Sequence, residues 1–318
     1  MNNSNLCEHI LKSIESVFIT DEPCILKKIL CAFLAGGHIL LEDNPGLGKT
    51  SLVKTIAKTC DIEWKRIQFT PDLMPSDIIG SKIWDAKTST FKLEKGPVFT
   101  NFLLADEINR AMPKTQSALL EAMEEHQITI DGVTNKLMEP FVVMATQNPI
   151  EMEGTYSLPE AQLDRFSIKL SLGYLRKFES EFQILKNRIE TANDDISHNI
   201  SPVASKEQII QLKQGVENVF VHDNIVSYIT RIVRQTRVNS NIRVGASPRG
   251  ALSLLKLAKA MAFIDGRTFV NPDDVKSLAK DVLAHRILLN FECTIEGVDA
   301  RDIIGDILDA VQVPTEFA

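Results

Sequence analysis

The stretch LEDNPGLGKTS, at residues 41–51, limits the possible folds more than any other part of the chain. It matches the phosphate-binding pattern G-x-x-x-x-G-K-[ST] at Gly48, Lys49 and Thr50, but Asp43 stands at the position of the first glycine. An apolar run precedes the loop, and a helical pattern follows it. We therefore expect a strand, a loop and a helix in this order, which is the arrangement of a phosphate-binding loop.

The residue types in this loop suit phosphate binding. Gly46 and Gly48 let the backbone turn its N–H groups inward, and a helix that begins near Lys49 directs its positive end at the anion. Lys49 supplies a charge for the β- and γ-phosphates, and Thr50 supplies a hydroxyl for Mg²⁺. The alternative is a chance GKT in an ordinary turn. The predicted nucleotide-binding residues are Asp43, Asn44, Pro45, Gly46, Leu47, Gly48, Lys49, Thr50 and Ser51.

Short apolar runs alternate with helical patterns in the first half of the chain. Near-continuous apolar strands of this kind indicate a parallel sheet covered by helices on both faces, hence an α/β fold. After residue 172 the patterns are almost entirely helical. The strand-like runs are residues 38–42, 65–69, 101–106, 140–147 and 166–172.

This change of character predicts two domains. We place an α/β nucleotide-binding core at residues 1–175, a linker at 176–200 and a helical domain at 201–318. Two stretches, near 80–97 and 126–140, each contain two strand-like runs around turn residues, and we interpret them as inserted β-hairpins.

Two acidic residues end the apolar run FLLAD. The carboxyl edge of a parallel sheet is where ligands of open α/β folds bind, so Asp106 and Glu107 are candidates for that site. Asp106 would hold Mg²⁺ through its waters, and Glu107 would orient and polarise the attacking water. The alternative is a strand that ends in solvated acids.

Three further residues are candidates for the same chemistry. Asn148 ends another buried run and could hydrogen-bond the γ-phosphate, although an Asn before Pro is more often a turn former. Arg165 precedes the last strand-like run, and Arg249 lies in the first turn of a helix that Ser247 would cap. The helix dipole disfavours a cation there, whereas a phosphoryl transfer site needs guanidinium groups. For a single arginine, a surface ion pair is the ordinary alternative.

Several long motifs, in the family's order, resemble those of the MoxR family of AAA+ ATPases. The resemblance extends over about residues 10–290 and implies a P-loop AAA+ core with a five-stranded parallel sheet, a smaller all-helical lid and assembly as a ring, usually a hexamer. The motifs are RIQFTPDLMPSDIIG (66–80), LADEINRAMPKTQSALLEAMEE (104–125), ATQNPIEMEGTYSLPEAQLDRF (145–166), and GASPRGALSLLKLAKAMAF with DGRTFVNPDDV (within 245–275).

The resemblance also implies ATP and Mg²⁺ as cofactors and gives roles to individual residues. The implied set is the Walker A pair Lys49 and Thr50, the Walker B pair Asp106 and Glu107, sensor 1 Asn148, the arginine finger Arg165 and sensor 2 Arg249.

Four residues carry more specific expectations. Loops of the form LEDVPGxGKT are frequent in the family, so we expect Asp43 at the strand end with its side chain turned away from the phosphates. Asn44, where the family often has a small apolar residue, should do little harm. Arg249 is expected to act from the lid of its own subunit. Arg165, on the far side of the sheet from the loop, is expected to complete a neighbour's site.

For four other residues the expectation is packing. Trp84 and Phe91, on the first hairpin, are either exposed grips on a client protein or packed at its base, and packing is favoured because large aromatics are more often buried. His285 and Arg286 receive no role beyond helix packing and complementarity to the helix dipole.

The composition indicates the cellular compartment and the classes of partner that are not favoured. Net charge is −7 and no Lys/Arg-rich run is present, so binding to nucleic acid is not favoured. The five cysteines form no C-x-x-C or Cys/His cluster, which suits a reducing cytoplasm. We see no basic leader with an apolar run and no membrane-spanning stretch.

The resemblance implies an ATP-hydrolysing, chaperone-like remodeller of partner proteins. Such partners often contain a von Willebrand factor A domain, and the work often concerns metal or cofactor insertion and complex maturation. The alternatives are a chelatase motor subunit, a nucleic-acid motor and a non-hydrolysing sensor. Net charge argues against the second, and the complete set of candidate catalytic residues argues against the third. Met112, where proline is common in the family, is a small departure from the MoxR pattern.

Overall fold

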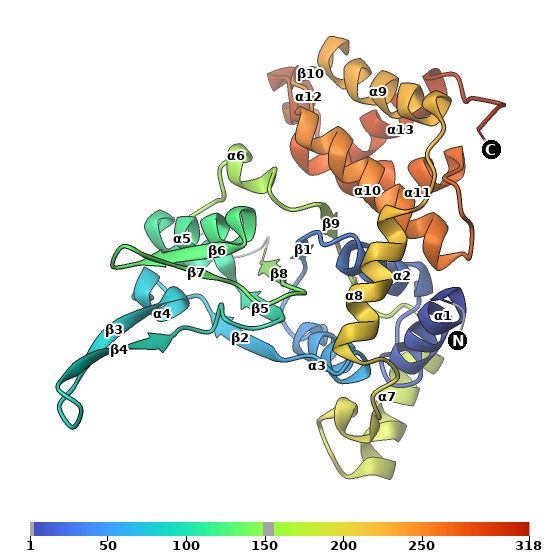
Figure 1. The fold of residues 1–318 in the computed structure, drawn as a ribbon. Helices are drawn as coiled ribbons and strands as arrows, with labels where there is room; N and C mark the ends of the chain where they lie inside the picture. Colours follow the sequence, from blue (N-terminus) through green and yellow to red (C-terminus); the bar gives the residue numbers. More distant parts are fainter. Residues whose placement is uncertain (1–2, 149–155, 318) are drawn as a thin grey trace.

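The computed structural model describes residues 3–148 and 156–317, and part of the motif at 145–166 therefore lies outside the described residues. A five-stranded sheet forms the centre, and all of its neighbouring strands are parallel (Figure 1). This confirms the sheet that the resemblance implied. In spatial order the strands are β2 (Trp64–Gln68), β5 (Phe102–Asp106), β8 (Val142–Gln147), β1 (Ile39–Glu42) and β9 (Ile168–Leu170).

The central strands are apolar throughout because both faces of the sheet are buried. Successive side chains point to opposite faces, so Leu40 and Leu103 pack into one apolar layer and Ile39 and Phe102 into the other. The first layer includes residues of α4 and α5, and the second includes residues of α1, α2 and α3. The helices of this part are α1 (Asn3–Glu15), α2 (Pro23–Leu34), α3 (Lys49–Thr59), α4 (Pro75–Ile79), η1 (Ile108–Arg110), α5 (Pro113–Glu125) and α6 (Glu160–Leu163).

The C-terminal part is a helical lid with one exception. A short antiparallel pair joins β10 (Ile242–Val244) to β11 (Leu288–Leu289), so the expectation of an all-helical lid is wrong in this detail. Runs this short have no periodicity that a sequence could reveal. The remaining elements are α8 (Lys206–Glu217), α9 (Asp223–Val238), α10 (Pro248–Ile264), α11 (Pro272–Leu283), η3 (Ala284–Arg286), α12 (Phe291–Ile295) and α13 (Ala300–Ala310).

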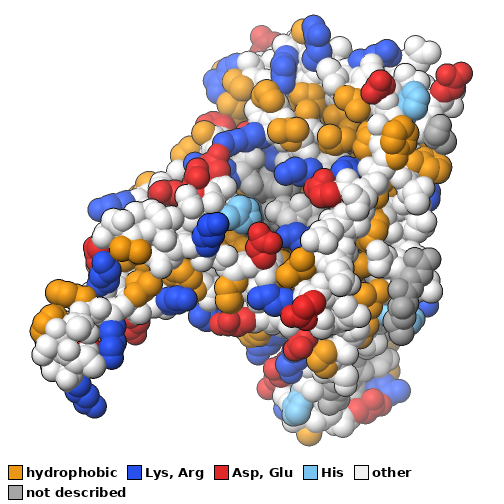
Figure 2. Space-filling view, viewed as in Figure 1, with side chains coloured by type: hydrophobic (Ala, Val, Ile, Leu, Met, Phe, Trp, Pro, Cys, Tyr) orange, Lys and Arg blue, Asp and Glu red, His pale blue; other side chains and the backbone are white. Residues whose placement is uncertain are grey.

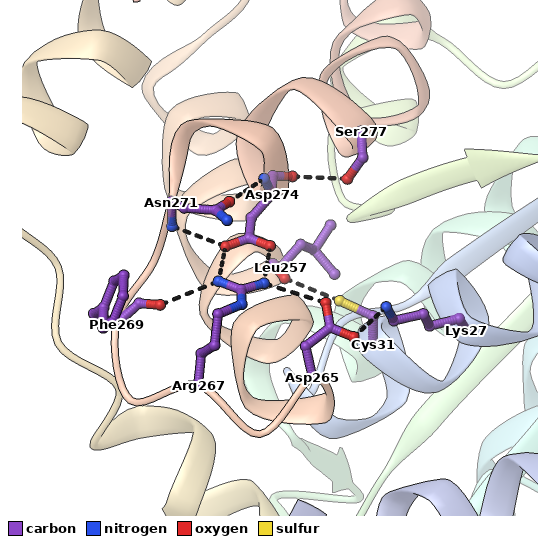
Figure 3. Close-up of polar contacts among 9 residues, drawn as sticks. All are labelled: Lys27, Cys31, Leu257, Asp265, Arg267, Phe269, Asn271, Asp274 and Ser277. Carbon is purple, nitrogen blue, oxygen red and sulfur yellow. Dashed lines mark hydrogen bonds and ion pairs between the residues drawn. The ribbon is translucent and has the colours of Figure 1, made fainter. Parts of the chain in front are cut away.

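The lid and the N-terminal helices share one continuous apolar core, and a polar cluster reinforces this junction (Figure 3). Arg267, in the turn between α10 and α11, donates to both carboxylate oxygens of Asp274 at 2.6 and 2.7 Å. Asp265, beside it, accepts from Lys27 of α2 at 2.5 Å. The hydrogen bonds to Asp274 raise the pKa of Arg267. The domain limits stay a prediction.

Both stretches that we interpreted as inserts form antiparallel hairpins. β3 (Gly80–Asp85) and β4 (Thr90–Lys95) project away from the body, whereas β6 (Gln127–Ile130) and β7 (Val133–Lys136) lie beside α5 (Figure 1).

The predicted linker at 176–200 contains a helix, α7 (Phe178–Thr191), and a short η2 (Ile196–Asn199). α7 has no buried residue and exposes an apolar stripe formed by Phe178, Phe182, Leu185 and Ile189. In the described part of the chain, no helix is long and apolar enough to cross a membrane.

Candidate functional site

The loop between β1 and α3 has the backbone of an anion cradle. Gly46 and Gly48 adopt positive φ angles of 86° and 77°, a region that glycine enters without steric cost. Gly48 is the N-cap of α3, so the first N–H groups of this helix face the loop. A Cβ at Gly46 would meet no atom within 4 Å, which leaves space beside this backbone for a ligand.

Lys49 is fixed across the loop. Its Nζ donates to the carbonyl oxygen of Asp43 at 2.7 Å. Partial burial lowers the pKa of Lys49, while the charges of Asp43, Asp106 and Glu107 oppose this shift. The ammonium group is therefore held on the loop backbone, within electrostatic reach of three carboxylates.

The carboxylate of Asp43 is directed at the end of β9. It accepts hydrogen bonds from Ser171 Oγ at 2.7 Å, from the N–H of Leu172 at 2.8 Å and from the N–H of Gly173 at 3.1 Å. The side chain is only 4% exposed, and it connects the start of the loop to the neighbouring strand. This is the strand-end placement that we expected, and a role in nucleotide binding stays a prediction. Asn44, the next residue, donates through Nδ2 to the hydroxyl of Tyr174 at 3.1 Å.

Replacing Asp43 with alanine should destabilise the loop more than it harms catalysis. Three donors would lose a charged acceptor, and the loss of a hydrogen bond to a charged group costs about 1.5–3 kcal/mol. We expect a lower melting temperature and about tenfold weaker ATP binding, because the loop loses one anchor. Thermal melting and ATP titration measure both effects. Asp43→Asn keeps one acceptor oxygen, so its melting temperature and ATP affinity should lie between those of the wild type and of Asp43→Ala. A wild-type melting curve for Asp43→Ala would contradict this account.

Asp106 ends β5 with both carboxylate oxygens engaged. Oδ1 accepts from Thr146 Oγ1 at 2.7 Å, and Oδ2 accepts from Arg66 Nη2 at 2.6 Å. Arg66 lies on β2, and its neighbour Gln68 is in register with Asp106. Arg66 thus neutralises the acid that we predicted as a metal ligand.

Glu107 follows in a left-handed conformation with φ of 56°, which turns the chain sharply at the strand end. Its carboxylate accepts from Gln68 Nε2 at 2.8 Å and from Arg110 Nη1 at 2.9 Å. Its N–H donates to Thr146 Oγ1 at 2.8 Å. One threonine on β8 therefore holds both acids in place. Sequence reasoning missed these supporting residues.

Residues from several strands meet at one cavity of about 260 Å³. The carboxyl ends of β1, β5 and β8 meet at this edge of the sheet, as in other open α/β folds. The structure thus brings together the predicted Walker A, Walker B and sensor 1 residues. The lining consists of Asp43, residues 45–50, Arg66, Gln68, Asp106, Glu107, Thr146 and Asn148.

The donor set fits a Mg²⁺–triphosphate group. Among the described residues, no cluster of three or more His, Cys, Asp or Glu is placed to hold a metal ion. Mg²⁺ usually takes one or two carboxylates together with substrate phosphates, and Asp106 with the hydroxyl of Thr50 offers such a partial set. When bound, the ion would neutralise charge on the phosphates.

The two candidate arginines lie elsewhere. Arg165 Nη2 contacts Glu124 Oε2 at 3.0 Å, and Arg249 Nη2 contacts the other oxygen of the same carboxylate. Arg165 precedes β9, and both arginines line a cavity of about 200 Å³ together with the residues just before β1. This is the amino end of the parallel strands, opposite the loop.

The expected action of Arg249 within its own subunit does not agree with this placement. The four residues of β1 alone separate the two edges by about 13 Å. The lid packs against α2 and the amino edge, so the first turn of α10 reaches Arg165 and Glu124 and not the loop.

Trp84 and Phe91 also differ from expectation. They are 55% and 67% exposed, and their rings contact edge to face with centroids 5.2 Å apart. The packing interpretation was wrong, because both rings are largely exposed, and Figure 2 shows hydrophobic side chains on the surface of the projecting hairpin. His285, in contrast, is half-buried against the core, with Nε2 3.1 Å from the carbonyl oxygen of Phe166. This burial holds its pKa well below the usual value.

The sheet, the glycine loop with its lysine and the paired acids at the end of β5 define a P-loop ATPase. A family model described as "ATPase family associated with various cellular activities (AAA)" matches residues 38–168, and an AAA lid domain model matches residues 234–307.

Individual relatives extend over nearly the whole chain. Protein YeaC of Bacillus subtilis (strain 168) is 50% identical over 287 residues, which cover 90% of this chain and 88% of YeaC. Chaperone MoxR1 of Mycobacterium tuberculosis is 41% identical over 305 residues, covering 93% of this chain and 79% of MoxR1. A solved structure of a candidate ATPase from Cytophaga hutchinsonii superposes with a TM-score of 0.90 at 42% identity, covering 98% of this chain and 96% of that one. The chain belongs to the MoxR family of AAA+ ATPases, and it hydrolyses ATP.

Proposed function

We propose that this ATPase works as a homo-oligomeric ring, a hexamer as is usual in the family, and remodels partner proteins in a chaperone-like manner. Hydrolysis of Mg²⁺–ATP would drive the movement. The name of the Mycobacterium relative, Chaperone MoxR1, supports this function. A cytoplasmic location is part of the proposal, since all five cysteines are free thiols.

The main support for a ring is that the candidate catalytic groups lie at two opposite edges of the sheet. The loop and the acids line one edge of the sheet, and Arg165 and Arg249 line the other. A head-to-tail interface brings opposite edges of successive subunits together, and it closes into a ring when the rotation allows. Each ATP would then lie between the loop of one subunit and the arginines of the next.

The chemistry would be divided in the same way. Lys49 and Thr50 bind the phosphates, and Glu107 orients and polarises the attacking water. Asn148 hydrogen-bonds the γ-phosphate or that water. The neighbour's arginines neutralise charge that develops on the transferred phosphoryl group, a contribution that exists only when the subunits are assembled.

A second observation supports the action on partner proteins. The β3–β4 hairpin extends from the body (Figure 1), and its exposed pair Trp84 and Phe91 offers an apolar contact. Aromatic side chains displayed in this way are frequent anchors of protein interfaces. We assign the pair to partner contact and propose a von Willebrand factor A domain protein as the partner, with cofactor or metal insertion as the purpose.

ATP turnover in the presence of candidate partners tests this function. We expect a von Willebrand factor A domain protein to raise turnover several-fold, since partner contact shifts the population of the competent state. DNA and a metal-free tetrapyrrole should have no effect; stimulation by either one alone would favour the nucleic-acid or the chelatase alternative.

Variants of the hairpin sharpen the test. Trp84→Ser with Phe91→Ser should keep basal turnover and lose the stimulation. Ile83, 48% exposed and adjacent to Trp84, points to the opposite face of the same strand, so Ile83→Ser is the matched control and should retain stimulation. Equal stimulation of all three proteins would remove the hairpin from the proposal.

A further inference from the structure

Asp164 connects the two segments that carry the candidate arginines. It directly precedes Arg165, and its carboxylate Oδ2 accepts from the hydroxyl of Ser247 at 2.7 Å. Ser247 is the N-cap of α10 and accepts from the N–H of Arg249 at 3.1 Å. The carboxylate of Asp164 is therefore adjacent in sequence to Arg165, and it hydrogen-bonds the residue that caps the helix of Arg249.

Arg286 holds this carboxylate from inside the lid. Its side chain is 1% exposed, and its Nε donates to Asp164 Oδ1 at 2.8 Å. Burial lowers the pKa of Arg286, and Asp164 opposes that shift. A buried arginine at a junction is retained only when its donors are paired, so the remaining contacts show what it joins.

The guanidinium of Arg286 spans three elements. Nη2 donates to the carbonyl of Phe166 at 2.6 Å and to Ser253 Oγ of α10 at 3.1 Å. Nη1 donates to the carbonyl of Ser167 at 3.2 Å and to that of Val282 in α11. The core segment before β9 is thereby tied to two lid helices.

The backbone of α10 passes close to this side chain. A Cβ at Gly250 would lie 3.2 Å from Cδ of Arg286, a distance tighter than ordinary van der Waals contact. Gly250 follows Arg249 directly, so the arginine stem packs against the same helical turn that presents the second candidate arginine.

We infer that Asp164 and Arg286 are positioning residues that fix Arg165 and Arg249 as one unit. Glu124 contacts both guanidinium groups and completes the arrangement. The inference rests on the proposed function, in which this pair serves a neighbour's ATP. Catalytic geometry is sensitive at this level, because a displacement of about 1 Å can cost about 10²-fold in rate.

Asp164→Asn tests the inference in the assembled protein. We expect kcat to fall about 10- to 100-fold, with ATP affinity and ring assembly retained. In an Arg165→Ala background the same substitution should cost distinctly less in rate, because only Arg249 is left for Asp164 to position. If Asp164→Asn fails to fold, Ser247→Gly replaces it in the test. Glycine is a tolerated N-cap, and the substitution removes only the hydroxyl that contacts Asp164. We expect kcat of this variant to fall several-fold.

Arg267→Lys is the matched control, because it weakens another ion pair of the lid that lies away from the two candidate arginines. Lysine cannot reproduce its two-pronged contact with Asp274 (Figure 3), so this variant should lose stability and keep its turnover. Wild-type turnover of Asp164→Asn, or an equal loss of rate with and without Arg165, would overturn the inference. Wild-type turnover of Arg165→Ala itself would overturn the proposed function instead.

Discussion

Replacing Lys49 with alanine is expected to abolish ATP turnover and to weaken ATP binding strongly. Its ammonium group is the only cation held on the backbone of the loop by a hydrogen bond among the described residues, and it lies among three carboxylates. Without it, the triphosphate would face Asp106 and Glu107 with one compensating charge fewer. The loss of an electrostatic contact of this kind costs about 10²–10³ in rate.

Phosphate release and equilibrium ATP binding measure the two effects separately. Lys54, one and a half turns further along α3, contacts Asp195 at 3.4 Å outside the cavity, so Lys54→Ala is the matched control and should behave like the wild type. A Lys49→Ala protein that hydrolyses ATP at the wild-type rate would remove the loop from the active site.

Arg165→Ala is expected to retain ATP binding and lose most of its turnover. In related phosphoryl-transfer systems an arginine supplied by a partner contributes about 10³–10⁵ in rate. The residue lies at the amino edge of the sheet, away from the loop of its own subunit. ATP affinity should therefore change by no more than about threefold, since the substrate contacts of the loop remain.

Steady-state turnover at protein concentrations above and below assembly, together with ATP titration, checks this result. Arg243, an exposed residue on β10, provides the control substitution Arg243→Ala. A fall in ATP affinity as large as the fall in turnover would show that Arg165 contributes uniform binding, contrary to our assignment.

The order of the elements was predictable because each signal is local. The loop, the apolar strands and the two acids lie in short stretches with their own periodicity, and the structure has β1, β5 and β8 where the sequence indicated them. The supporting residues Arg66 and Gln68 were not predictable, because their contacts with Asp106 and Glu107 depend on the register of two strands far apart in sequence.

The positions of Arg249 and Arg286 depend on how the lid packs. Neither residue carries a local signal of its partner, since Glu124 and Asp164 precede them by more than eighty residues. Arginine is seldom fully buried, and sequence reasoning gave Arg286 no role beyond helix packing and complementarity to the helix dipole. Its burial becomes understandable only when three elements supply acceptors for one guanidinium group.

Mixing two inactive variants tests the shared active site most directly. Glu107→Gln lacks the residue that activates water but keeps Arg165, whereas Arg165→Ala has the opposite defect. In a mixed ring, an Arg165→Ala subunit beside a Glu107→Gln neighbour has every group that the site needs. For random assembly at equal amounts, about a quarter of the sites are complete in a head-to-tail ring, and turnover should recover to about that fraction of the wild-type rate. A mixture that hydrolyses ATP no faster than its two components, although they exchange subunits, would contradict a site shared between neighbours.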